Sequence, residues 1–96
     1  MISTEVIQDV KLIEGTFTPA EAREVVISFL EEKINFHKRR KLNLWLRDKD
    51  ANTERHDKRI AELLVEKKKM EELLAEAMEE GRNLQINGTL EINFVK

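Results

Sequence analysis

Between residues 60 and 78, apolar residues recur at three- and four-residue steps among Glu and Lys. They are Ile60, Leu63, Leu64, Met70, Leu73, Leu74, Ala77 and Met78. This spacing is typical of a helix with one buried stripe. A stripe of this length needs a partner helix of similar length, and residues 19–47 can supply one. The pattern therefore predicts two long helices, 19–47 and 53–80, that pack against each other.

Residues that favour helix ends flank both segments. Thr18-Pro19-Ala20-Glu21 has the sequence of a capping box, with Pro at the first helical position. Asp50, Asn52 and Thr53 are eligible N-caps for the second helix, and Gly81 suits a left-handed C-cap. Each helix then has about 28 residues and is about 42 Å long. The short connection between them predicts an antiparallel helical hairpin.

A short strand is predicted on each side of this hairpin. Residues 10–17 read as a strand that contains Gly15, and residues 1–9 as a frayed lead-in. Residues 84–95 alternate between apolar and polar positions, which indicates a half-buried strand. Asn87-Gly88 is also a two-residue turn signal, so this segment forms either one strand or a short hairpin. The helical hairpin brings the two strands together, and we expect a single β-α-α-β domain over residues 1–96.

The apolar face of the first helix is wider than one partner helix covers. The predicted core consists of Val26, Phe29, Leu30, Ile34, Ile60, Leu63, Leu64, Leu73, Leu74 and Ala77. Phe29, Phe36, Leu42 and Trp45 are candidates for an interface with another molecule. A two-stranded ribbon is also marginally stable alone and has open edges. Both features predict a homo-oligomer, with the number of subunits left open.

Charged residues make up 38% of the chain, which is well above the average for a globular domain. Residues 33–59 contain ten basic and four acidic residues, whereas the rest of the chain has a net charge of −8. The absence of Cys excludes disulfides and thiolate metal sites. No apolar run is long enough to span a membrane, and residues 1–10 do not resemble a signal peptide. We therefore expect a cytoplasmic protein.

The basic residues near the predicted hairpin tip allow two interpretations. They are Lys38, Arg39, Arg40, Lys41, Arg47, Arg55 and Arg59. They can neutralise the phosphates of a nucleic acid while Trp45 stacks on an unpaired base. Alternatively, they form a solvated or self-associating surface, because four consecutive residues on a helix point in four directions. The second interpretation is favoured, and nucleic-acid binding is the alternative.

No pattern predicts a catalytic, cofactor or metal site. A turn centred near residue 50 would place His56 opposite Leu44 or Trp45, about 10 Å along the helices from His37. On this estimate the two histidines cannot share a metal ion. The acidic residues of segment 71–80 lack the turn geometry of a cation site. The sequence therefore predicts a non-enzymatic interaction or scaffold protein that uses no cofactor. The predicted partner is another copy of the chain, with a different protein as the alternative.

Overall fold

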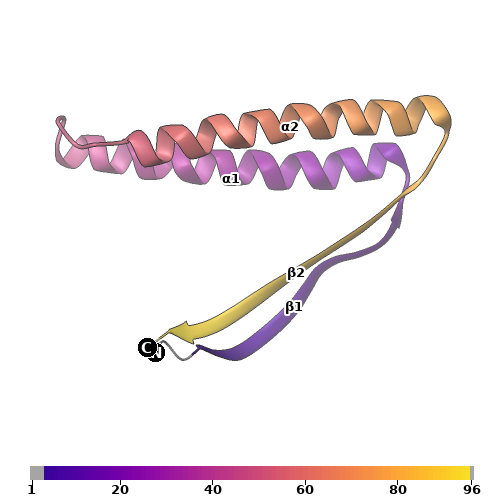
Figure 1. The fold of residues 1–96 in the computed structure, drawn as a ribbon, viewed down its shortest axis with the longest axis horizontal. Helices are drawn as coiled ribbons and strands as arrows, with labels where there is room; N and C mark the ends of the chain where they lie inside the picture. The colour runs from indigo at the N-terminus through magenta and orange to yellow at the C-terminus, as the bar shows by residue number, and fades with distance from the viewer. Residues whose placement is uncertain (1–3, 96) are drawn as a thin grey trace.

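The computed structural model describes residues 4–95 and consists of two strands and two helices (Figure 1). Strand β1 spans Thr4–Phe17, helix α1 Pro19–Arg47, helix α2 Glu54–Glu80 and strand β2 Leu84–Val95. The helices lie side by side as an antiparallel hairpin, and the strands pair antiparallel. The mainly helical β-α-α-β arrangement predicted from the sequence is therefore confirmed.

Helix α1 begins at the capping box that the sequence predicts. The Thr18 hydroxyl accepts a hydrogen bond from the Glu21 backbone N–H at 3.2 Å. The Glu21 carboxylate in turn accepts one from the Thr18 backbone N–H at 3.0 Å. Hydrogen bonding to Thr18 holds the pKa of the Glu21 carboxyl group below its ordinary value. The bond from the Thr18 backbone N–H has the largest effect, followed by that of the Thr18 side chain. Two backbone donors that have no partner inside the helix are thus satisfied.

The connection between the helices does more than reverse the chain. The Ala51 backbone N–H donates to the Asp48 carbonyl at 3.0 Å, which closes a tight turn. Residues 51–53 are not helical, and the Asn52 side chain accepts from the Glu54 backbone N–H at 2.9 Å. An extended residue advances about 3.3 Å, compared with 1.5 Å in a helix. The connection therefore runs back along α1 before α2 begins, as Figure 1 shows.

Helix α2 ends at Gly81, which adopts the expected left-handed conformation with φ of 65°. The Gly81 backbone N–H donates to the Met78 carbonyl at 3.2 Å, and that of Arg82 donates to Ala77 at 2.9 Å. These bonds satisfy carbonyls in the last turn of the helix. The chain then enters β2 at Leu84.

The two strands form a ribbon, the name used below for β1 and β2 together. Pairing extends from Phe17 opposite Leu84 to Thr4 opposite Val95. Strand β2 is continuous, with Asn87 and Gly88 both paired to β1, so the alternative of a hairpin at these residues is wrong.

The prediction that β1 starts at residue 10 and that the preceding segment is frayed is also wrong for residues 4–9. Residues 90–95 of β2 offer this segment a row of backbone partners. Such pairing can order a segment whose own sequence has only a weak strand signal. Residues 1–3, predicted to belong to the same lead-in, lie outside the described residues.

The buried core is small. Its residues are Ala22, Ile27, Ile34, Leu63, Leu74 and Ala77. The line of contact between the two helices, called the seam below, includes α2 residues at steps of three and four. Leu63 and Leu74 lie in this seam and are buried, whereas the adjacent Leu64 and Leu73 lie outside it. The prediction that Phe29, Leu64 and Leu73 are core residues is therefore wrong, because each is about half exposed. Three further predicted residues are partly buried, namely Val26, Leu30 and Ile60.

The ribbon packs on the helices only at its base. There Phe17, Leu84 and Ile86 cover the core residues Ala22, Ile27 and Leu74, with Met70 beside them. Beyond this contact the ribbon diverges from the helices, and the two arms form an open V (Figure 1). The whole molecule measures 50 × 34 × 20 Å.

Candidate functional site

Two histidines from different helices meet in the seam near the hairpin tip. His37 Nδ1 of α1 and His56 Nδ1 of α2 are 3.1 Å apart, within hydrogen-bonding distance. The predicted separation of about 10 Å is therefore wrong. The reason is the non-helical segment 51–53, which starts α2 further back along α1 than a turn centred at residue 50 would.

The short distance between the two nitrogens limits the protonation states of the pair. One Nδ1 donates its hydrogen and the other accepts it, so both rings cannot be protonated while the bond persists. Burial lowers the pKa of His37, and the positive charges of His56, Lys33, Arg59 and Arg55 lower it further. The local potential around the pair is therefore positive.

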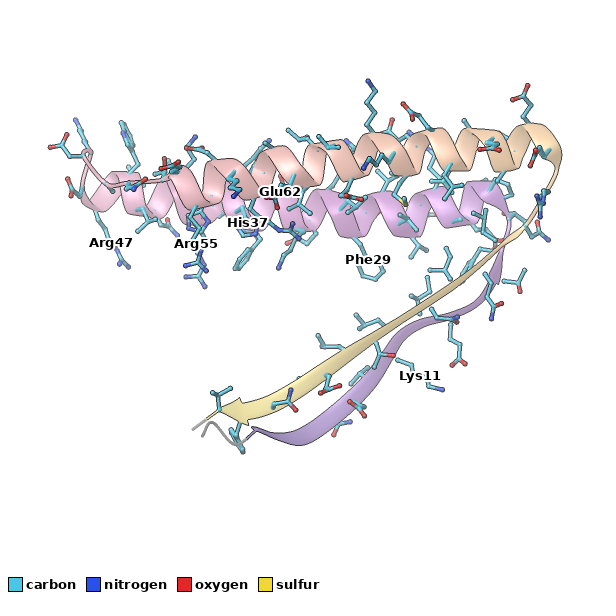
Figure 2. The ribbon with its side chains drawn as sticks, viewed as in Figure 1. Lys11, Phe29, His37, Arg47, Arg55 and Glu62 are labelled. Carbon is cyan, nitrogen blue, oxygen red and sulfur yellow. The ribbon has the colours of Figure 1, made fainter. Side chains whose placement is uncertain are left out.

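Two adjoining grooves follow the seam on either side of His37 and Arg55. One has a volume of about 390 Å³ and is lined by Phe36, His37, Arg40, Asn43, Leu44, Arg47, Arg55 and His56. The other, of about 430 Å³, is lined by Lys33, His37, Arg55, Lys58, Arg59 and Glu62. We call the two together the basic trough. Figure 2 shows that its residues His37, Arg47 and Arg55 lie on the side of the helices that turns toward the ribbon.

Most cations of the basic trough have no carboxylate partner nearby. Arg59 pairs with Glu62 at 3.0 Å, and Glu62 is the single acidic residue among those that line the trough. Within residues 8–95, no carboxylate forms an ion pair with Arg40, Arg47 or Arg55. The Arg40 guanidinium instead lies over the Phe36 ring, 5.1 Å from its centroid.

The structure divides the seven basic residues predicted as a contact surface. Four of them, Arg40, Arg47, Arg55 and Arg59, line the basic trough. Lys38 and Lys41 line a different groove, and Lys41 forms an ion pair with Asp57 at 2.6 Å. Arg39 lies outside both and pairs with Glu32 at 3.0 Å.

The aromatic residue that accompanies the trough is Phe36, whereas the sequence hypothesis assigned this role to Trp45. Trp45 lines the separate groove of about 430 Å³ with Leu42, Lys38 and Lys41. Lys33 and Lys58 also line the trough, although neither is among the seven basic residues predicted from the sequence. Lys33 could have been recognised. Its signal is the seven-residue spacing of Lys33, Arg40 and Arg47, which places all three on one side of α1.

The four apolar interface candidates likewise lie on two sides of the hairpin. Phe29 and Phe36 are exposed, and Figure 2 shows Phe29 on the side that faces the ribbon. Leu42 and Trp45 are exposed in the other groove. No single flat partner can contact all four residues of one molecule.

Other features provide no further functional assignment. Among residues 8–95, no group of three or more metal-ligating side chains converges, and neither α1 nor α2 is apolar enough to cross a membrane. No family model, no curated protein and no solved structure matches the chain.

Proposed function

We propose that this protein is a non-enzymatic scaffold that assembles with copies of itself through the far half of its ribbon. The observation that supports this proposal is an apolar ribbon face that nothing in the monomer covers. Figure 2 shows hydrocarbon side chains that project from the ribbon into the V, toward the helices.

Strand alternation identifies the residues of this face. Phe17, Leu84 and Ile86 point toward the helices, because they pack on the core. Every second residue of β2 shares that face, so Leu90, Ile92 and Phe94 belong to it. Val10 lies opposite Leu90 in the ladder and points the same way, and Gln8, opposite Ile92, is a polar residue on this otherwise apolar face. Ile92 is 47% exposed and Phe94 is 71% exposed.

The accessible surface of the whole chain supports the same proposal. A compact monomer of 11.3 kDa is expected to expose about 5,700 Å². This chain exposes 7899 Å². The excess of about 2,200 Å² is larger than the roughly 800 Å² that each partner contributes to a standard protein interface. The monomer therefore has enough uncovered surface for a permanent contact.

The occupant we propose for the V is the ribbon of a second copy. Two apolar ribbon faces can pack on each other as sheets do, about 10 Å apart. The contact is self-complementary, since each copy offers the same residues to the other, as a two-fold axis requires. A lone two-stranded ribbon is marginally stable, and stacking on a second one stabilises both.

Light scattering at low and high salt tests the proposal, with wild type expected at about twice 11.3 kDa in both. The variant Leu90→Asp/Ile92→Asp places two charges in the ribbon interface and is expected to be monomeric. The control Thr89→Asp/Gln85→Asp adds the same charge to the opposite face of β2 and is expected to keep the wild-type mass. A monomeric wild type would refute the proposal, as would a folded Leu90→Asp/Ile92→Asp variant that keeps the oligomeric mass.

A further inference from the structure

The basic trough concentrates positive charge from both helices. Lys33, Arg40 and Arg47 come from α1, and Arg55, Lys58 and Arg59 come from α2. Glu62 neutralises one of these six charges through its ion pair with Arg59. The remaining cations do not stabilise the hairpin through ion pairs with neighbouring carboxylates in residues 8–95. Their mutual repulsion opposes folding unless an anion answers it.

The spacing of these cations suits an extended anion. The seven-residue steps from Lys33 to Arg40 and on to Arg47 are each about 10.5 Å along the helix. The α1 cations therefore extend along about 21 Å, and those of α2 line the other wall of the trough. A free phosphate ion would contact one end of this row. A polymer with phosphates at regular intervals can contact the whole of it.

The residue types match phosphate chemistry. An arginine guanidinium donates two parallel hydrogen bonds to phosphate oxygens, and three of the trough cations without ion pairs are arginines. Phe36 lies at the wall with Lys33 and Arg40 over its ring, at 5.3 and 5.1 Å from the centroid. An aromatic ring among cations is the combination that binds single-stranded nucleic acids without sequence preference.

We infer that the basic trough binds the phosphate backbone of a single-stranded nucleic acid. The inference rests on the trough alone and does not require self-assembly through the ribbon. A metal ion is a poorer occupant for the same place, because Lys33, Arg55 and Arg59 surround the His37 imidazole. Trp45 takes no part, since it lies in the other groove.

Fluorescence anisotropy with a labelled 20-nucleotide oligothymidine, at 50 and 200 mM salt, tests the inference. The variant Arg40→Gln/Arg47→Gln/Arg55→Gln removes three cations that form no ion pairs. Each phosphate contact to a single strand contributes about −0.7 to the slope of log K against log salt concentration. The loss of three contacts reduces the slope by about 2, so the affinity change between the two salt concentrations becomes about 20-fold smaller than in wild type.

A control variant separates the trough from overall charge. Lys38→Gln/Arg39→Gln/Lys68→Gln removes the same net charge outside the trough and is expected to retain the wild-type slope. Circular dichroism verifies that each variant is folded. Should the triple trough variant unfold, Arg47→Gln and Arg55→Gln are measured singly, and each is expected to reduce the slope by about 0.7.

Three results would overturn the inference. One is the absence of binding by the wild-type chain at 50 mM salt. Another is an equal loss of binding in the control variant, which would show a non-specific charge effect. The third is competition by inorganic triphosphate or polyglutamate as effective as that by the oligonucleotide. In the third case the trough takes a small phosphate or an acidic protein instead.

Discussion

The hydrogen bond between the two histidine rings is expected to make the packing of the helices sensitive to pH. The groups that face His37 are Lys33 on its own helix and His56, Arg55 and Arg59 on α2, together with the edge of Phe36. Burial and these charges lower the pKa of His37 below its ordinary value of 6.5. Between the folded pKa and 6.5 the unfolded chain binds more protons than the folded one, so stability rises with pH.

The first prediction is that the melting temperature of the wild-type chain falls as the pH is lowered from 8 to 5. The contribution of His37 is complete above pH 6.5 and is lost as the pH falls through its folded pKa. The variant His37→Gln/His56→Gln lacks this response and serves as the comparison. The prediction is tested by thermal unfolding at half-unit pH intervals. Parallel curves for the two proteins would contradict it.

Gly81 provides a second prediction at the scale of one residue. Its φ of 65° strains any residue with a Cβ atom, although no atom lies within 4 Å of where that Cβ would be. The cost of Gly81→Ala is therefore conformational, about 1 kcal/mol of unfolding free energy. Gly81→Asn is expected to cost less, because Asn tolerates the left-handed conformation. Urea unfolding of both variants measures the difference.

At the scale of the element, the packing of the two helices buries some leucines of α2 and leaves others exposed. Leu74 is 5% exposed and packs with Ala22 and Ile27, whereas Leu64 is 50% exposed. Leu74→Asp places a charge in the seam without a partner and is expected to unfold the hairpin. Leu64→Asp makes the same chemical change on the same helix and is expected to leave it folded. Circular dichroism at 222 nm tests the two variants. Equal helicity in both would contradict the prediction that Leu74, and not Leu64, is buried between the helices.

The sequence predicted those features of the fold that depend on local chemistry. The capping box at Thr18 and the left-handed cap at Gly81 are determined by one or two residues each, and both are confirmed. The longitudinal register of the two helices, meaning which residue of α1 lies beside which residue of α2, could not be predicted from local chemistry. It depends on how far the chain advances in residues 51–53, and a helical and a non-helical residue differ in rise by about a factor of two.

The candidate site was likewise predictable only in part. The basic character of the tip is evident from residue counts. Its separation into a trough and a second groove depends on the angular position of each side chain, which changes by 100° per residue. The contact between His37 and His56 depends on the longitudinal register of the two helices. Because that register could not be predicted, the sequence-based estimate placed the two histidines apart. The burial of Leu63 and Leu74, and the exposure of the adjacent Leu64 and Leu73, also depend on how the two helices pack.

At the scale of the whole molecule, the V leaves the far half of the ribbon without packing against the helices (Figure 1). Gly15, with φ of 149°, lies in β1 between the contact with the helices and the exposed half. Its partner across the ladder is Ile86, the last residue of β2 that packs on the core cluster. The exposed apolar face begins beyond this pair. Stability in this half of the ribbon is therefore expected to depend on protein concentration.

The last prediction follows from that dependence. If the ribbon folds fully on association, the melting temperature of the wild-type chain rises with protein concentration by mass action. The variant Leu90→Asp/Ile92→Asp is expected to melt at the same temperature at every concentration. Scanning calorimetry over a hundredfold range of concentration makes the comparison. A wild-type melting temperature that is independent of concentration would contradict self-assembly.

The tight turn at residues 48–51 also has a consequence that we expect for the order of folding. Contacts of the hairpin and the ribbon are nested around this turn, and their separation along the sequence grows steadily toward the ends. Pairing Phe17 with Leu84 directly would close a loop of more than sixty residues, with the corresponding loss of chain entropy. Once the two helices have packed together starting from the turn, Phe17 and Leu84 are already close, and their pairing costs little further chain entropy. We therefore expect the ribbon to form last and to open first.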